Sequence, residues 1–202
     1  MLNIFARASV SRVTDPIGAW LLRSGLTPNT VTVLGTVCSV AASLWFIPRG
    51  QLFLGAAVVT AFLLFDLIDG AMARAQGGGT KFGAVLDASC DRIADGALFG
   101  AIAWWAFDAG EKGLAVATLV SLVGAQVTSY VKARAEASGL TADVGIAERA
   151  DRFIVALVGI GIGDLGVPYI TAVALYVLPV LIVVTVVQRL LAVHRSAKES
   201  AA

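Results

Sequence analysis

The sequence is poor in charged residues, in cysteine and in histidine, and each scarcity excludes a class of protein. Only 14% of its 202 residues are charged, against about a quarter in a soluble globular domain, and the mean hydropathy is +0.85. Cys38 and Cys90 are isolated cysteines that make neither a disulfide framework nor a zinc site, and His194 is the single histidine. The composition therefore indicates an integral membrane protein, and no nucleic-acid partner is expected.

Long uncharged runs predict the fold, because a transmembrane helix needs about 20 predominantly apolar residues. The predicted spans are residues 26–48, 51 to the first aspartates, 82–107, 113–131, 153–163 and 165–188. We therefore expect an all-α integral membrane protein with six transmembrane helices and both termini on one side. Residues 1–202 show no internal repeat and are expected to form one domain, with a membrane bundle at 28–190 and a tail at 191–202.

Residues 1–27 are predicted to form a juxtamembrane surface segment. Leu2, Phe5 and Val10 recur at helical spacing, and Arg7 and Arg12 lie between them. This pattern is typical of an amphipathic helix lying in the membrane interface. No charged stretch runs into an apolar core with a small-residue cleavage site, so we expect no signal peptide.

The basic residues predict the orientation of the spans. In a six-span topology all of them except Arg49 and Lys112 fall on one side of the membrane: Arg7, Arg12, Arg23, Arg74, Lys81, Arg92, Lys132, Arg134, Arg149, Arg152, Arg189, Arg195 and Lys198. Loops that carry an excess of lysine and arginine stay in the cytoplasm. Both termini are therefore expected to be cytoplasmic.

Four aspartates form two pairs that a helix would place on one face. Asp66 and Asp69 are three residues apart, and Asp87 and Asp91 are four apart. Carboxylates from two facing helices can hold two divalent ions about 3.5–4 Å apart, as in phosphoryl-transfer sites. With no cluster of histidine or cysteine residues available, such a site favours Mg²⁺ or Mn²⁺ over zinc.

The depth of these acids supports a functional role. Counting about 1.5 Å per helical residue inward from Arg49 and Asp108 places Asp66 and Asp91 about 25 Å from the outer surface. The same count from Asp164 places Arg152 below the cytoplasmic boundary. Ionisable groups at such depth normally face a cavity and are functional. The sequence therefore predicts a charged cavity that opens to the cytoplasm.

Glycines and a helix start near the acids suit a phosphate ligand. Gly70 and the run Gly77–Gly79 allow close approach to the backbone, and Thr80 adds a hydroxyl. The Pro28-Asn29-Thr30 sequence opens the first span, where free backbone N–H groups can hold an anion. An ordinary cytoplasmic turn is the alternative interpretation of the glycines.

The string Asp66-x2-Asp69-Gly70-x2-Ala73-Arg74-x8-Gly83-x3-Asp87-x3-Asp91 resembles the signature of the CDP-alcohol phosphotransferases at every position. The resemblance covers essentially the whole chain and implies that an alcohol attacks a CDP-alcohol and expels CMP. It implies that Asp91 is a metal ligand and the base for the attacking hydroxyl. The implied metal ligands are Asp66, Asp69, Asp87 and Asp91. The implied CDP-lipid residues are Asn29, Thr30, Val31, Thr32, Gly70, Arg74 and Thr80.

A basic tract predicts a phosphorylated acceptor, because arginine binds phosphate in a bidentate manner. The candidate acceptor residues are Lys132, Arg149, Arg152 and Arg195. The other basic residues of this region, Arg134, Arg189 and Lys198, are interpreted as topology charges. Asp95, one turn after Asp91, is interpreted as a supporting or helix-polar residue.

The tract resembles that of bacterial phosphatidylinositol phosphate synthases. This resemblance implies CDP-diacylglycerol as donor, inositol 1-phosphate as acceptor, a homodimer, and the bacterial plasma membrane with a cytoplasmic active site. One alternative is a phosphatidylglycerophosphate synthase, for which glycerol 3-phosphate is the acceptor. A divalent-metal transporter is disfavoured because the acids gather toward one membrane face. An intramembrane aspartyl protease fits four acids and a glycine loop poorly.

Overall fold

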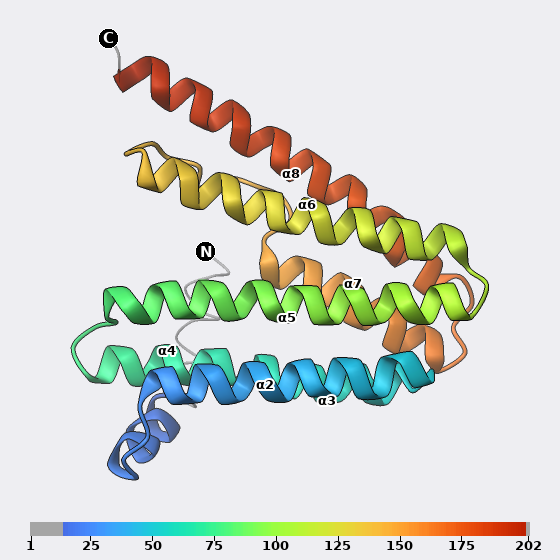
Figure 1. Ribbon diagram of the computed structural model, residues 1–202, viewed down its shortest axis with the longest axis horizontal. Helices are drawn as coiled ribbons and strands as arrows, with labels where there is room; N and C mark the ends of the chain where they lie inside the picture. Colours follow the sequence, from blue (N-terminus) through green and yellow to red (C-terminus); the bar gives the residue numbers. More distant parts are fainter. Residues whose placement is uncertain (1–13, 201–202) are drawn as a thin grey trace. The chain divides into compact units, whose positions relative to one another are not determined.

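The structure is a computed structural model that describes residues 14–200, without the side chain of Asp66. Residues 14–23 are helical, and no strand occurs in the described part of the chain (Figure 1). The elements that follow are α2 (Pro28–Phe46), η1 (Ile47–Arg49), α3 (Leu52–Leu63), α4 (Phe65–Ala75), α5 (Lys81–Asp108), α6 (Lys112–Ala137), α7 (Arg149–Asp164) and α8 (Ile170–Ser200). The predicted all-α class is confirmed.

Four helical segments of the described chain are long and apolar enough to cross a membrane. They are Pro28–Arg49, Leu52–Ala75, Lys112–Ala137 and Ile170–Ser200. The other two predicted spans correspond to α5, which has 28 residues but carries several ionisable side chains, and to α7, which has 16 residues. The chain is therefore a multi-pass membrane protein. The predicted amphipathic helix falls largely on residues 1–13, outside the described part.

Some predicted boundaries agree with the structure and others do not. The α5 helix begins and ends within one residue of its prediction, whereas α6 continues to Ala137 and α7 begins at Arg149, beyond the predicted limits of 131 and 153. The last helix begins at Ile170 and not at residue 165, because Gly166 has a left-handed backbone (φ 90°) and Pro168 interrupts the helix. It then continues to Ser200, so most of the predicted C-terminal tail is helical.

The described chain divides into two compact units. The N-terminal unit comprises residues up to Ala42 together with Val58–Ala94, and the C-terminal unit comprises Ser43–Ala57 together with Asp95 onward. In the N-terminal unit, a Cβ atom added at Gly18 would lie 3.2 Å from Met72, so the first helical segment packs closely on α4. Met72 is fully buried in this contact. This packing fixes the position of α4, the helix that carries Asp69, within the unit.

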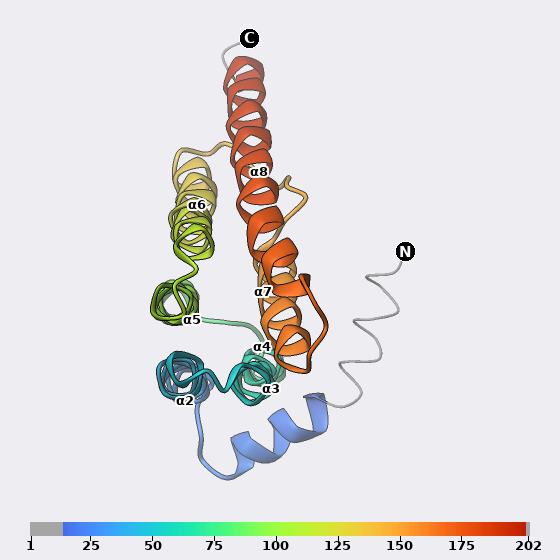
Figure 2. The same ribbon diagram turned by 90° about the vertical axis from the view of Figure 1, so that its right-hand side faces the viewer.

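In the C-terminal unit, α8 lies along both α6 and α7 (Figures 1 and 2). Phe99, Ile160, Leu178 and Ile182 are fully buried there. A Cβ atom added at Gly124 would lie 2.5 Å from Ile182, so α6 and α8 depend on a glycine for their close approach. Many apolar side chains elsewhere on α8 are exposed, as expected for a surface that faces lipid.

Side chains of α8 hold the backbone of the connection at residues 138–148. The Thr185 hydroxyl accepts a hydrogen bond from the Ala147 N–H at 3.1 Å, and the Gln188 amide oxygen accepts one from Ile146 at 3.1 Å. Arg189 donates to the carbonyl oxygens of Val144 (2.9 Å) and Thr128 (2.8 Å). Arg189 is 6% exposed. Its interpretation as a topology charge is therefore wrong, because it is buried and binds backbone carbonyls.

Candidate functional site

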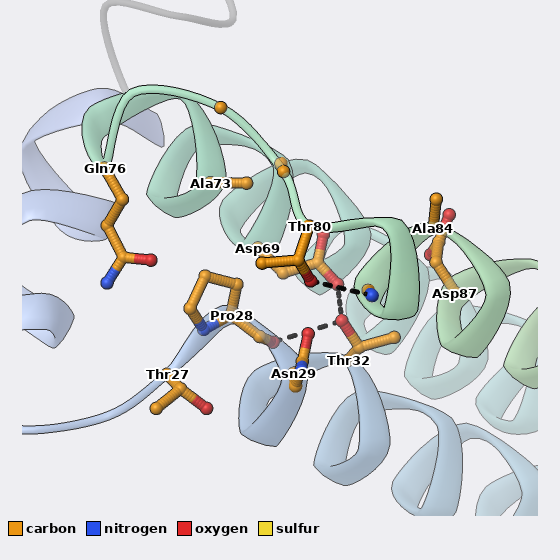
Figure 3. Close-up of a pocket in the computed structure, with 14 residues that line it drawn as sticks. Thr27, Pro28, Asn29, Thr32, Asp69, Ala73, Gln76, Thr80, Ala84 and Asp87 are labelled. Carbon is orange, nitrogen blue, oxygen red and sulfur yellow. Dashed lines mark hydrogen bonds between the residues drawn. The ribbon is translucent and has the colours of Figure 1, made fainter.

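A cavity of about 420 Å³ lies in the N-terminal unit and contains two of the four aspartates (Figure 3). Its walls come from the start of α2, from α4, from the turn after α4 and from the first turns of α5. The lining residues are Thr27, Pro28, Asn29, Thr32, Asp69, Gly70, Ala73, Gln76, Gly78, Gly79, Thr80, Gly83, Ala84 and Asp87. The cavity thus gathers residues that are far apart in the sequence.

Local backbone rules build the turn that closes this cavity. Gly77 and Gly78 have φ angles of 90° and 128°, which residues with a side chain rarely adopt. The Thr80 hydroxyl then accepts a hydrogen bond from the Gly83 N–H at 2.9 Å and caps the start of α5. A Cβ atom at Gly83 would lie 3.1 Å from both the Asn29 side-chain oxygen and the Thr80 hydroxyl, so a side chain here would press on the cavity wall.

Asp69 and Thr32 meet between α4 and α2, as Figure 3 shows. The Thr32 hydroxyl donates to the Asp69 carboxylate and also lies 3.1 Å from the Pro28 carbonyl oxygen. Asp69 is 8% exposed and Thr32 is 6% exposed. A buried carboxylate needs such partners, because loss of hydration disfavours its charged form. Thr32 therefore orients and stabilises an acid at the bottom of the cavity.

The structure places the other acids differently. Asp87 is exposed and lines the same cavity from α5. Asp91 is partly buried, with its Oδ2 atom 3.8 Å from Nη2 of Arg92. The side chain of Asp66 lies outside the described residues, although its position three residues before Asp69 in α4 gives the predicted helical spacing. Two of the predicted ligands thus share one cavity.

The donor set suits a hard divalent cation. Among the side chains that the structure describes, no three aspartate, glutamate, histidine or cysteine residues form a group able to hold a metal ion. The cavity does contain oxygen donors: Asp69, which accepts from the Thr32 hydroxyl, and Asp87, which lines the cavity from α5. Mg²⁺ and Mn²⁺ prefer such ligands, and Mg²⁺ is commonly bound through one or two carboxylates plus substrate phosphates. The residues present therefore fit such an ion.

Of the predicted CDP-lipid residues, Asn29, Thr32, Gly70 and Thr80 line the cavity. The other three are not in its lining. Thr30 donates its backbone N–H to the Thr27 hydroxyl at 3.2 Å, Val31 is buried in the unit, and Arg74 is exposed with Nη2 3.5 Å from Asp15.

Two polar lining residues, Thr27 and Gln76, were missed by the sequence analysis. Thr27 caps α2, and a threonine directly before a proline at a helix start is a signal that could have identified it. Gln76 follows the last residue of α4 and carries no comparable signal. It lines the cavity at the point where α4 ends and the glycine turn begins.

The predicted acceptor residues lie in the C-terminal unit, and Lys132 forms ion pairs there. Its ammonium nitrogen lies 2.6 Å from Asp143 and 3.9 Å from Glu136. Hydrogen bonding to Lys132 and its positive charge hold the pKa of Asp143 below its usual value. Lys132 thus also anchors the connection between α6 and α7.

The three arginines of the prediction occupy different surroundings. The Nε atom of Arg149 lies 3.2 Å from Asp95, and Arg152 is 2% exposed. Arg195 lines a groove of about 450 Å³ with Val144, Gly145, Ile146, Gln188, Leu191 and Ala192. Arg152 is thus buried within the unit. Arg195 instead has a largely apolar neighbourhood.

Comparisons with known proteins give consistent results. A family model described as CDP-alcohol phosphatidyltransferase matches residues 25–194. The phosphatidylinositol phosphate synthase of Mycobacteroides abscessus is 52% identical over 198 residues, which are 97% of this chain and 90% of that protein. The enzyme of the same name from Mycobacterium tuberculosis is 54% identical over 193 residues, 94% of this chain and 89% of that protein.

Two crystal structures of the Mycobacterium tuberculosis enzyme resemble this chain, each with a TM-score of 0.87. One has CDP-DAG bound, is 54% identical, and matches 90% of this chain and 94% of that chain. The other is in complex with manganese and citrate, is 53% identical, and matches 91% of this chain and 90% of that chain.

Proposed function

Because this chain belongs to the CDP-alcohol phosphatidyltransferase family, we propose that it transfers the phosphatidyl group of CDP-diacylglycerol to inositol 1-phosphate. The products are phosphatidylinositol phosphate and CMP. The match over residues 25–194 and the named relatives at 52% and 54% identity support this assignment. The sequence-based prediction of an enzyme of this family is confirmed.

One observation carries the proposal: Asp69 and Asp87 line one cavity with a threonine hydroxyl and a glycine turn. A CDP-lipid carries a diphosphate. Cations must offset its negative charge, and its oxygens must be able to approach the protein backbone closely. The carboxylates provide sites for divalent cations, and the glycines allow phosphate oxygens to approach the backbone. The cavity volume of about 420 Å³ is in the range of small-molecule sites.

The enzyme uses a divalent metal, and we assign two Mg²⁺ or Mn²⁺ ions to the four signature aspartates. The proposed ligands are Asp66, Asp69, Asp87 and Asp91. When bound, such ions offset the negative charge on the diphosphate and on the departing CMP. Thr32 keeps the Asp69 carboxylate oriented for this role.

The remaining steps belong to side chains of this chain. Asp91 accepts the proton of the acceptor hydroxyl while that oxygen attacks the lipid-side phosphorus and the bond to CMP breaks. Asn29, Thr30, Val31, Thr32, Gly70, Arg74 and Thr80 hold the CDP-lipid. Lys132, Arg149, Arg152 and Arg195 hold the phosphate of the acceptor. The burial of Arg152 supports its part in this set, because ionisable groups inside a membrane protein normally face a functional site.

The proposed setting of this chemistry is the bacterial plasma membrane. The chain forms one domain of six spans with an amphipathic helix within residues 1–27, both termini and the active site are cytoplasmic, and two copies form a homodimer. The concentration of lysine and arginine on one side of this topology supports the orientation.

The decisive experiment measures CMP release by the purified protein with CDP-diacylglycerol and Mn²⁺ or Mg²⁺. Inositol 1-phosphate, inositol, glycerol 3-phosphate and serine are compared as acceptors. We expect release with inositol 1-phosphate and its loss with a chelator. Release with glycerol 3-phosphate but not with inositol 1-phosphate contradicts the acceptor assignment, and release with none of them contradicts the proposed activity.

A further inference from the structure

Asp95 is a fully buried carboxylate in the C-terminal unit, and the reaction described above does not use it. It is 0% exposed, and it follows Asp91 by one helical turn of α5. Burial of a carboxylate costs several kcal/mol unless a well-placed cation and hydrogen bonds offset it. The position of Asp95 in α5 does not by itself explain why a carboxylate is buried there.

One cation that pairs with this carboxylate is Arg149. Its Nε atom donates to Oδ1 of Asp95 at 3.2 Å, and its side chain is 24% exposed whereas that of Asp95 is 0% exposed. Solvent therefore reaches the arginine side chain but does not reach the carboxylate. A guanidinium has five N–H donors in a rigid plane, so a bond at Nε fixes the direction in which the other donors point.

Two further contacts fix the same arginine. Its guanidinium carbon lies 4.9 Å from the centroid of the Phe153 ring, one turn along α7. The first turn of α7, where Arg149 begins the helix, is held by the Glu148 N–H, which donates to Asp151 at 2.9 Å. The guanidinium is thus oriented by its backbone, by an aromatic ring and by a buried acid.

From this geometry we propose that Asp95 is a positioning residue for acceptor specificity. It holds Arg149 so that the guanidinium binds the phosphate of the phosphorylated alcohol, and it does not itself touch either substrate. The inference rests on the proposed function, because Arg149 is there assigned to the acceptor phosphate. Preorganised donors bind phosphate more tightly, because less side-chain entropy is lost on binding.

The test compares Michaelis constants for the two substrates. We expect Asp95→Ala to raise the KM for inositol 1-phosphate about tenfold, the value of one charged hydrogen bond, and to leave the KM for CDP-diacylglycerol unchanged. Asp95→Asn keeps an oxygen that can accept from Nε and should restore most of the affinity. Arg134→Ala, which removes an exposed positive charge from α6, is the matched control and should alter neither constant.

A double-mutant cycle separates positioning from a structural tie between α5 and α7. If Asp95 acts through Arg149, the Asp95→Ala change adds nothing to the KM of an Arg149→Ala enzyme. Equal increases in both Michaelis constants, or an additive effect in the double variant, overturn the proposal. If the Asp95→Ala protein does not fold, the Arg149→Lys variant tests the proposal instead. Lysine keeps the positive charge but lacks the planar set of donors. An unchanged KM for the acceptor in this variant refutes positioning.

The controls distinguish this inference from the proposed function. A wild-type enzyme that releases no CMP with inositol 1-phosphate refutes that acceptor, and the same cycle is then measured with glycerol 3-phosphate. If no phosphorylated alcohol supports release, both the function and the positioning role are wrong. If release occurs and Arg149→Ala raises the acceptor KM but Asp95→Ala does not, only the positioning role is wrong. If neither variant changes that constant, the assignment of Arg149 to the acceptor phosphate is also wrong, while the proposed reaction stands.

Discussion

Replacement of Thr32 by valine should weaken metal binding while preserving the fold. Valine has nearly the same shape as threonine but cannot donate to the Asp69 carboxylate, which is 8% exposed. Leaving a buried acceptor without its donor costs about 1–3 kcal/mol. Loss of a group that orients a metal ligand typically lowers metal affinity about 10- to 100-fold. We therefore expect Thr32→Val to raise the Mn²⁺ concentration for half-maximal CMP release by a factor in that range.

Thr36→Val is the matched control, one turn further along α2. Its hydroxyl donates to the backbone carbonyl of Thr32 at 2.8 Å, and it does not line the cavity. We expect the Thr36 variant to keep the wild-type requirement for Mn²⁺. The rise in melting temperature on adding Mn²⁺ without substrate provides a second readout, which should shrink only in the Thr32 variant. Equal behaviour of the two variants in both assays refutes the role assigned to Thr32.

Three further substitutions test the remaining parts of the site. Asp91→Asn should abolish CMP release while the detergent-purified protein keeps its wild-type elution volume, and equal turnover would remove Asp91 as the base. Arg152→Ala should raise the KM for inositol 1-phosphate at least about tenfold and leave that for CDP-diacylglycerol unchanged; equal effects on both constants contradict an acceptor role. Gly83→Ala should raise the KM for CDP-diacylglycerol, because the new methyl group meets Asn29 and Thr80 at 3.1 Å, whereas Gly96→Ala, on the same helix but outside the cavity lining and with nothing within 4 Å of the new methyl group, should not.

The sequence predicted the parts of the molecule that depend on local rules. The spacing within the pairs Asp66/Asp69 and Asp87/Asp91 needs only helix geometry, and α4 and α5 provide it. The turn at Gly77 and Gly78 follows from the φ angles that glycine alone adopts freely. Length and low charge were enough to predict a helical membrane protein, and its helical segments agree.

The parts that escaped prediction depend on which distant segments meet. Arg189 lies near the end of an apolar helix, where a basic residue usually orients the helix in the membrane, and nothing local shows that it binds Val144 and Thr128. The pairing of Asp95 with Arg149 likewise joins residues that are 54 positions apart. The helix break at Leu64, between α3 and α4, involves neither proline nor glycine, so no local signal predicts it. In the structure the Leu67 N–H donates to the carbonyl oxygen of Leu64, only three residues earlier.

The bonds between α8 and residues 138–148 have a consequence for how the protein is made. Together with the bond from the Thr141 N–H to the Ser196 hydroxyl, they join positions 38 to 55 residues apart, and the α8 partner is always synthesised later. A nascent chain that ends before α8 can therefore form the Lys132–Asp143 ion pair, but it lacks the α8 side chains that bind this segment. The connection between α6 and α7 acquires its hydrogen bonds with α8 only near the end of translation.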